Sequence, residues 1–195
     1  MGGKAFSEQL PTAVFLRMPT PFYGSLKDRV VSRLEALYSL VAVPPEVPGK
    51  TDHGDIDVLV CKPKNVKEGV PLSECVTPTE IEQALGCAHS FLEPRDRTLH
   101  LAIPIQQDEV QHFAIDQDEV KEGKINLEQL YVQVDLHFCK DMETWESRFF
   151  FQSYGELGRI LSKLAETAGF AWSTRRLKVR RASGIQCPQT NELRY

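Results

Sequence analysis

The sequence predicts an α/β fold, because it contains two kinds of hydrophobic periodicity. From residue 25 onward, apolar side chains recur every three or four positions, as on one face of a helix: Leu26, Val30, Leu34, Leu37 and Val41. In residues 55–60 and 131–138, apolar and polar side chains alternate, as in a strand with one buried face. A chain of 195 residues, 42% hydrophobic and 26% charged, is long and apolar enough to bury a sizeable core.

Prolines divide the first part of the chain. Residues 1–24 contain three prolines, which predicts an irregular lead-in. A helix is expected over residues 25–40, with Ser25 as its N-cap, and the proline-rich stretch at 44–48 ends it because proline blocks helix continuation. Residues 49–53 then form a short polar loop before the first strand.

A second helix is expected over residues 78–92. It has the usual start signals: Thr77 as the cap, a proline at the first helical position, and Glu80 three residues after the cap. Further on, the alternation in residues 99–103 predicts a strand, with residues 110–115 as its hairpin partner.

The last third of the chain contains three more predicted elements. Residues 131–138 alternate clearly and predict a strand. Residues 154–168 carry a helical stripe, and Gly169 suits the end of that helix. A last strand is expected over 177–180, and residues 181–195 have the composition of a polar tail.

Three carboxylates stand out on the predicted strands. In the run from Asp55 to Val60, side chains alternate faces, so Asp55 and Asp57 point the same way, opposite the apolar residues. Two ionised carboxylates ~4 Å apart repel by about 4 kcal/mol at an effective dielectric near 20. A divalent cation or a basic side chain would relieve this repulsion. Asp135, on the polar face of the later strand, would complete a set of oxygen ligands for Mg²⁺ or Mn²⁺.

These residues carry a family resemblance. Gly54-Asp55-Ile56-Asp57 followed by Val58-Leu59-Val60 resembles the Gly-Asp-x-Asp strand of the DNA polymerase beta-like nucleotidyltransferase superfamily, and Val134-Asp135-Leu136 resembles its third-carboxylate strand. Phe150-Phe151-Gln152-Ser153, followed by a helix, is similar to the segment that faces the incoming nucleotide in family X DNA polymerases. The resemblance covers most of residues 26–180.

The resemblance implies a palm-like fold, a mixed or antiparallel sheet with helices packed on one face. It divides the chain into a lead-in (1–24), a palm-like domain (25–140), a nucleotide-facing helix and strand (141–180) and the tail (181–195). It implies transfer of a nucleoside monophosphate from an NTP to a hydroxyl on RNA, protein or a small molecule. Two metal ions, Mg²⁺ or Mn²⁺, would be held by Asp55, Asp57 and Asp135. No helix-hairpin-helix module is evident, which argues against a template-directed repair polymerase.

The phosphate-binding loop departs from the family pattern. The superfamily places a Gly-Ser pair at a helix start about ten residues before the first aspartate, and Pro44-Pro45 occupies that region here. Gly49, Lys50 and Thr51 are the expected replacement: glycine allows close backbone approach, lysine supplies charge and threonine a hydroxyl. Gly54 belongs to the same expected nucleotide site.

Further candidates lie downstream. Ser153 and Tyr154 occupy the nucleotide-facing segment, and a basic stripe follows in which Arg176 and Lys178 are the expected phosphate contacts: Arg175, Arg176, Lys178, Arg180 and Arg181. The stripe is equally consistent with a solvated strand face. Tyr154 and Trp172 would either stack on a base or pack in the core.

Two histidines flank the acids. His53 and His137 would either assist phosphate and proton handling or be polar residues on a solvated face.

Composition limits the other classes of function. A net charge of −4 argues against a generally basic nucleic-acid coat, and no apolar run approaches the ~20 residues that span a bilayer. Five scattered cysteines without C-x-x-C spacing predict free thiols, and with no apolar leader we expect an intracellular protein, cytoplasmic or nuclear. The rival hypothesis is an inactive module of the same fold that binds nucleotide, RNA or a protein partner; a structural subunit of a larger assembly is a third.

Overall fold

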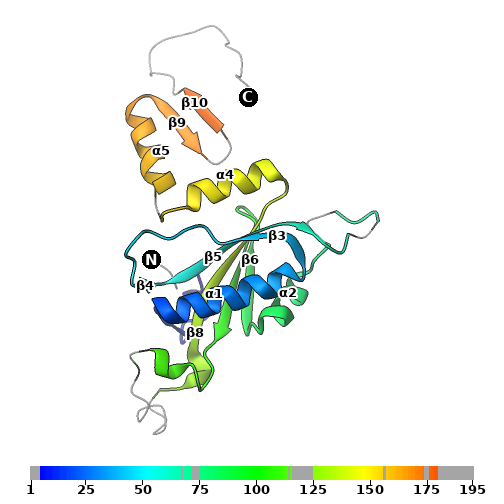
Figure 1. Ribbon diagram of the computed structural model, residues 1–195, viewed down its shortest axis with the longest axis vertical. Helices are drawn as coiled ribbons and strands as arrows, with labels where there is room; N and C mark the ends of the chain where they lie inside the picture. Colours follow the sequence, from blue (N-terminus) through cyan, green and yellow to red (C-terminus); the bar gives the residue numbers. More distant parts are fainter. Residues whose placement is uncertain are drawn as a thin grey trace.

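A mixed sheet of six strands forms the centre of the protein (Figure 1). The computed structural model describes residues 5–66, 68–71, 75–113, 115, 125–155, 157–173 and 176–179. The strand order is β3-β5-β8-β7-β6, and β1 also pairs with β8. Strands β5 and β8 are parallel neighbours, β1 is parallel to β8, and the other pairs are antiparallel. The strands are β1 (Val14–Phe15), β3 (Tyr38–Ala42), β5 (Asp55–Pro63), β6 (His89–Glu93), β7 (Thr98–Pro104) and β8 (Leu130–Phe138).

One face of the sheet carries the main core. Helices α1 (Thr20–Glu35) and α2 (Pro78–Leu85) pack against it. Alternation along β5 and β8 points every second side chain into this core, where they are fully buried: Ile56, Val58, Val60, Val132, Val134 and Leu136. The predicted α/β class, with helices packed against a mixed sheet, is therefore confirmed.

The opposite face carries a hydrophobic cluster at each of its two ends. At one end, Trp145 and Phe149 of α4 (Met142–Gln152) pack on Leu59, Cys61 and Cys139. At the other end lies an aromatic cluster that holds the N-terminal segment against the sheet: Phe6, Phe15, Phe91 and Tyr131. Between these clusters the sheet surface is polar.

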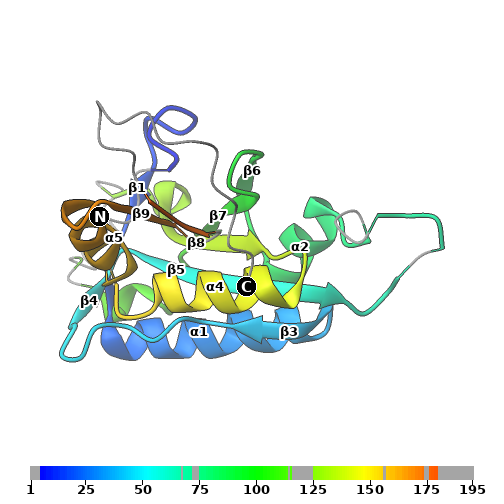
Figure 2. The same ribbon diagram turned by 90° about the horizontal axis from the view of Figure 1, so that it is seen from above.

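A small C-terminal layer lies beyond α4. Helix α5 (Leu157–Thr167) packs on the hairpin of β9 (Phe170–Ser173) and β10 (Arg176–Val179), on the side of α4 away from the sheet (Figure 1). Figure 2 shows α5 and β9 toward the same end of the sheet as β4 (Asp52–His53). Strand β4 pairs with β2 (Met18–Pro19) just before β5 begins.

The expected boundaries of the two early helices were wrong. Helix α1 begins at Thr20, five residues before the expected N-cap Ser25, because proline is well tolerated in a first helical turn. The helix also ends earlier than predicted, at Glu35. Residues 38–42 form strand β3 at the edge of the sheet instead of a last helical turn. Helix α2 stops at Leu85, since Gly86 adopts a left-handed conformation and ends it.

Two later expectations were also wrong. Strand β7 forms its hairpin with β6, which precedes it, and Val110–His112 is a short 3₁₀ helix whose neighbour Phe113 packs on Phe22. Helix α4 was not expected at all. The strand at 131–138, the helix ending at Gly169 and the final strand are confirmed within one to three residues.

No helix in the described ranges combines the length and the apolar character that crossing a membrane requires.

Candidate functional site

The three predicted carboxylates lie on one face of the two central strands. Asp57 of β5 is the direct register partner of Asp135 of β8, and Asp55 is the partner of Gln133. Because side chains two positions apart share a face, Asp55 and Asp57 lie side by side with Asp135 across the strand pair. The expectation that these acids share one face of a single sheet is confirmed.

Asp55 experiences the repulsion most strongly. Burial and the neighbouring charges of Asp57 and Asp135 raise the pKa of its carboxyl to about 6. Lys50 acts in the opposite direction but more weakly. Asp55 has no hydrogen-bond or ion-pair partner among the residues that the structure describes. Its environment therefore favours either a proton or a cation.

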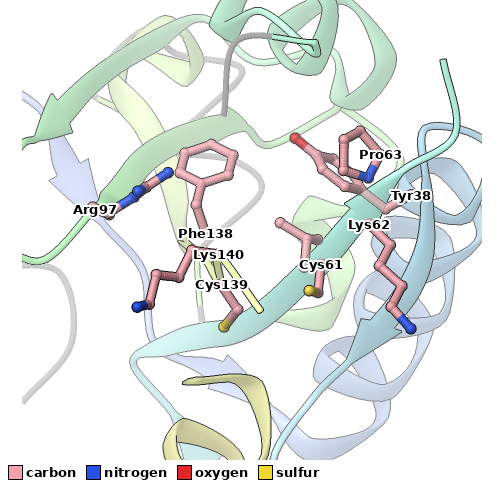
Figure 3. A pocket seen from close by; sticks show the side chains of 9 residues that line it. Tyr38, Cys61, Lys62, Pro63, Arg97, Phe138, Cys139 and Lys140 are labelled. Carbon is pink, nitrogen blue, oxygen red and sulfur yellow. The ribbon is translucent and has the colours of Figure 1, made fainter. Parts of the chain in front are cut away.

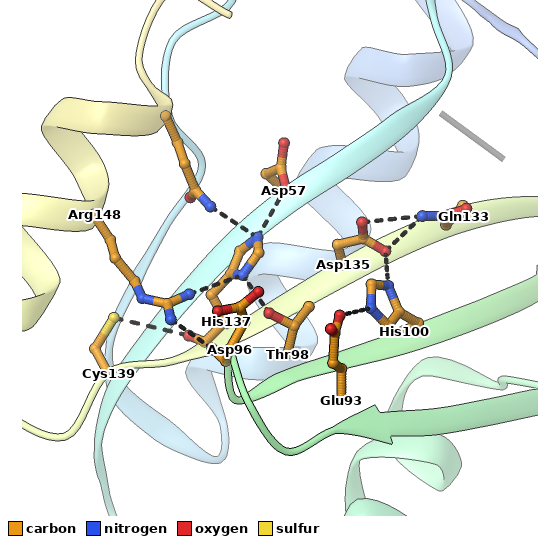
Figure 4. A network of polar contacts seen from close by, with 11 residues as sticks. Asp57, Glu93, Asp96, Thr98, His100, Gln133, Asp135, His137, Cys139 and Arg148 are labelled. Carbon is orange, nitrogen blue, oxygen red and sulfur yellow. Dashed lines mark hydrogen bonds and ion pairs between the residues drawn. The ribbon is translucent and has the colours of Figure 1, made fainter. Parts of the chain in front are cut away.

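Asp135 is held by the side chains of Gln133 and His100. The side-chain amide of Gln133 donates to both of its oxygens, at 2.8 and 3.0 Å, and Nδ1 of His100 lies 2.9 Å from Oδ1 (Figure 4). Burial opposes protonation of His100, but Asp135 and Glu93 outweigh it and raise the pKa of His100 above its usual value. The ring of His100 also stacks on Phe91, which fixes its orientation.

Asp57 is tied to helix α4 through His137. The Nε2–H of His137 donates to Asp57 Oδ1 at 2.8 Å, while its Nδ1 lies 2.9 Å from the hydroxyl of Thr98 and 3.2 Å from a guanidinium nitrogen of Arg148 (Figure 4). Because Arg148 can only donate, Nδ1 accepts, and His137 is the Nε2–H tautomer. The side chain of Asp57 is 44% exposed.

Gln152 completes this network from the last turn of α4. Its amide nitrogen lies 3.0 Å from His137 Nε2, and its Oε1 is a buried atom without a partner among the described residues. A 180° turn of the amide would place Oε1 where it can accept from the His137 Nε2–H, which is then shared between Gln152 and Asp57. Arg148 and Gln152 are four residues apart and so share one face of the helix.

The donor chemistry of the three acids fits a divalent cation, since Mg²⁺ and Mn²⁺ prefer carboxylate oxygens. The side chains of Asp57 and Asp135, however, are turned toward protein partners. Within the described part of the chain, no three His, Cys, Asp or Glu side chains gather closely enough to hold a metal ion. Asp57 and Asp135 would have to rotate from His137 and Gln133 for all three to bind one cation.

The expected phosphate loop lies beside the start of β5. Gly49 has a positive φ of 80°, and Lys50 pairs with Glu46 at 2.6 Å. The carbonyls of Lys50 and Thr51 accept hydrogen bonds from Thr20 at the start of α1. The loop is therefore fastened to the helix, and Lys50 already has an acidic partner. Gly54, which joins β4 to β5, is buried.

His53 is a packing residue in this structure. It is 3% exposed, and its ring stacks on Tyr23 with centroids 3.8 Å apart. Its Nδ1 lies 3.4 Å from Glu46. Of the two histidines beside the acids, only His137 contacts one of them.

Ser153 and Tyr154, the candidates in the nucleotide-facing segment, do not contact the three acids among the described interactions. Ser153 is buried and donates to the carbonyl of Phe149, which ends α4. Tyr154 is half exposed, has a positive φ of 56°, and its backbone N–H donates to the carbonyl of Pro45 at 2.6 Å. The segment from 153 to 155 thus lies against the stretch that precedes the expected phosphate loop.

Two members of the basic stripe, Arg176 and Lys178, belong to strand β10 of the hairpin beyond α4. Lys178 is exposed on β10, and the side chain of Arg176 lies outside the described residues, as do Arg175, Arg180 and Arg181. The ring of Trp172 packs against Phe150 and Phe151, with centroids 5.9 and 5.2 Å away, in a partly exposed aromatic cluster.

Sequence reasoning missed the partners of the acids, namely His100, Gln133, Thr98, Arg148 and Gln152. His100 lies between the buried Leu99 and Leu101, so its side chain points to the opposite face of the sheet. With β7 placed next to β8, this alternation would have predicted that His100 lies near Asp135. Trp145 and Phe149, four residues apart, were the signal for α4.

No protein-family model matches this chain, and no curated protein matches it at a significant level of similarity.

Proposed function

We propose that this protein is a metal-dependent nucleotidyltransferase that moves a nucleoside monophosphate from an NTP to a hydroxyl acceptor. The observation that carries the proposal is the in-register placement of Asp57 and Asp135 on adjacent parallel strands, with Asp55 two residues away on the same face. The side chain of Asp57 is 44% exposed, so a substrate can reach this acid, whereas Asp135 is buried beside it.

Asp55, Asp57 and Asp135 would hold the divalent cations, Mg²⁺ or Mn²⁺. When bound, these ions neutralise the phosphates and the charge that develops during phosphoryl transfer. The raised pKa of Asp55 supports this assignment, because a cation would relieve the repulsion that raises it.

The surrounding residues would position the acids. His137 fixes Asp57 and links it to Arg148 of α4. Gln133 and His100 orient Asp135, which would bind the catalytic ion and accept the proton of the attacking hydroxyl. The catalytic work of the protein is therefore positioning and charge neutralisation.

Nucleotide contacts are proposed on the side of β5 where the chain enters the sheet. Lys50 and Thr51 lie there, and their carbonyls are hydrogen-bonded to Thr20 at the start of α1. Tyr154 lies near this loop because its backbone N–H donates to the carbonyl of Pro45. Lys50 carries three donors, so its pairing with Glu46 leaves two for a phosphate. The acceptor class stays open among RNA, protein and small molecules.

The second candidate is an inactive module of the same fold that binds nucleotide, RNA or a protein partner. Two observations favour it: Asp135 is saturated by Gln133 and His100, and the described acids do not converge on one point. An inactive site does not need mutually repelling acids, however, and the retention of all three favours the enzyme.

Calorimetry distinguishes the two candidates. Mg²⁺ alone, and then each NTP in the presence of Mg²⁺, would be titrated into the wild type, the Asp55→Asn/Asp57→Asn double variant and the control Asp28→Asn, whose carboxylate lies on the exposed side of α1. An enzyme binds NTP only with metal, loses this binding in the double variant alone, and releases pyrophosphate when offered an acceptor. Metal-independent binding, or no binding, supports the inactive module.

A further inference from the structure

A pocket lined by apolar and cationic side chains lies at the far end of the central strands. It has a volume of about 290 Å³ and lies where β5 and β8 end (Figure 3). Asp55 and Asp57, in contrast, lie at the start of β5. Asp57 and Cys61 are four residue steps apart along an extended strand, a distance of about 13 Å. The pocket is therefore separate from the acidic site.

The charge of this pocket is uniformly positive. Its lining contains Lys62, Arg97 and Lys140, and no acidic residue among those that the structure describes. Arg97 and Lys140 lie on one side of the rim and Lys62 on the other (Figure 3). The whole chain has a net charge of −4, so this cluster of three cations makes the pocket positive in an otherwise acidic protein.

These cations are largely unpaired. Neither Lys62 nor Arg97 has a side-chain ion pair in the described ranges, and Lys140 pairs with Asp141 in an exposed contact at 3.2 Å. The pocket floor adds no negative charge, because burial raises the pKa of the Cys139 thiol to about 11 and also raises that of Cys61. The thiols are neutral at pH 7.

Backbone conformation provides an independent observation. Lys62 and Arg97 have positive φ angles of 56° and 53°, and Tyr154 is the other non-glycine residue with this feature in the described chain. Long side chains are uncommon in this region, where glycine and asparagine are favoured, and such strain gathers at ligand sites. Both strained residues place a cation on the same rim.

We infer that this pocket binds the phosphate group of a small phosphate-bearing molecule. Arg97 would donate two N–H groups of its guanidinium to phosphate oxygens. The flexible side chains of Lys62 and Lys140 would bring their ammonium groups to the same phosphate. The ring of Phe138, beside the Arg97 guanidinium, would face the group that bears the phosphate (Figure 3). The volume lies at the lower limit of small-molecule sites, which range from ~300 to 1,000 Å³, so a phosphomonoester or diphosphate fits better than a complete NTP.

The experiment uses the full chain and three phosphate probes in low salt: inorganic phosphate, pyrophosphate and phenyl phosphate, with malonate as the carboxylate control. Variants Lys62→Asn and Arg97→Asn remove one charge each, and asparagine tolerates the positive φ, so both variants should fold. Lys64→Asn is the matched control, because Lys64 is exposed on the same stretch but does not line the pocket.

Pyrophosphate should bind the wild type, the Lys64→Asn variant and an Asp57→Asn variant alike, and about 10- to 100-fold more weakly to Lys62→Asn or Arg97→Asn. Tighter binding of phenyl phosphate than of inorganic phosphate would identify a phosphomonoester as the ligand, and equal binding would identify the free anion. The inference is overturned if pyrophosphate does not bind, if malonate binds as well, or if Lys64→Asn weakens binding equally. The Asp57→Asn variant removes an acid of the proposed active site but leaves this pocket intact. A failure of this inference can therefore be distinguished from a failure of the proposed function.

Discussion

Asp57 and Asp135 are register partners on adjacent parallel strands, yet each is bound by a different set of protein groups. His137 donates to Asp57, whereas Gln133 and His100 hold Asp135. Asp55 lacks such a partner in the described structure, and the electrostatic cost of three acids on one face therefore falls on it. This uneven distribution has consequences that can be measured without knowing the substrate.

The first prediction concerns the pH dependence of stability. The pKa of Asp55 is raised to about 6 in the folded protein, above its ordinary value of 3.8. Between these values the folded protein keeps a proton that the unfolded chain has released, so this contribution to stability falls as the pH rises through the window. Asp55→Asn should therefore raise the free energy of unfolding by ~1–3 kcal/mol at pH 7.5 and change it little at pH 4.

Urea denaturation of the wild type and Asp55→Asn at both pH values tests this prediction. The exposed Asp28→Asn serves as the control and should change the free energy of unfolding by less than ~0.5 kcal/mol at either pH. A destabilised Asp55→Asn at pH 7.5 would mean that Asp55 has a favourable partner in solution. Saturating Mg²⁺ should stabilise the wild type and remove the advantage of the variant if the metal binds here.

The acids were predictable from the sequence because their placement depends on local alternation. In the strand that starts at Asp55, a period of two fixes which side chains face the core and which face outward. The capping box of Thr77 and Glu80 was predictable for the same reason, since its partners are three residues apart. Both features were read directly from short stretches of chain.

The partners of the acids depend on contacts between distant segments. His100 reaches Asp135 only because β7 pairs with β8 in one particular register, and nothing near His100 in the sequence fixes that register. Similarly, Arg148 reaches His137 only because α4 crosses the sheet. The predicted start of α1 was wrong for a local reason. Two prolines close together, at 19 and 21, are typical of a loop, but Pro21 lies within the first turn of the helix.

The second prediction concerns the link between His137 and Arg148. Replacing His137 by alanine removes the acceptor of Arg148 and the donor to Asp57, so two charged groups lose a hydrogen bond at once. The free energy of unfolding should fall by ~2–4 kcal/mol. His112→Ala, at an exposed histidine, is the matched control and should have a small effect.

A double-mutant cycle of His137→Ala and Arg148→Met isolates the contact itself. We expect a coupling free energy above ~0.5 kcal/mol, because residues in one hydrogen-bond network are not additive. Additive effects would contradict the direct bond between the two side chains. The cycle is read from urea denaturation and needs no assay of activity.

The third prediction concerns the start of α2. Thr77 accepts from the backbone N–H of Glu80, and the Glu80 carboxylate accepts from the N–H of Thr77. Thr77→Ala removes one half of this box and should cost ~1 kcal/mol of stability. Thr77→Ser retains the hydroxyl and should cost much less, so equal losses in the two variants would show that the cap contributes nothing.

The last prediction concerns the packing of α5 on α4, which sets the position of the segment from Ser153 to Gly155. A Cβ at Gly158 would lie 2.5 Å from the carbonyl oxygen of Phe151 and 2.8 Å from its Cα, and these backbone atoms cannot move aside. Gly158→Ala should therefore destabilise the protein by ~1–3 kcal/mol and lower its melting temperature. Gly24→Ala is the matched control: Gly24 lies inside α1, and an added methyl group there would meet nothing within 4 Å, so alanine should stabilise the helix by ~0.5–1 kcal/mol. Opposite signs for the two substitutions support the close contact between α4 and α5, and a Gly158→Ala variant as stable as Gly24→Ala would show that the two helices do not touch there.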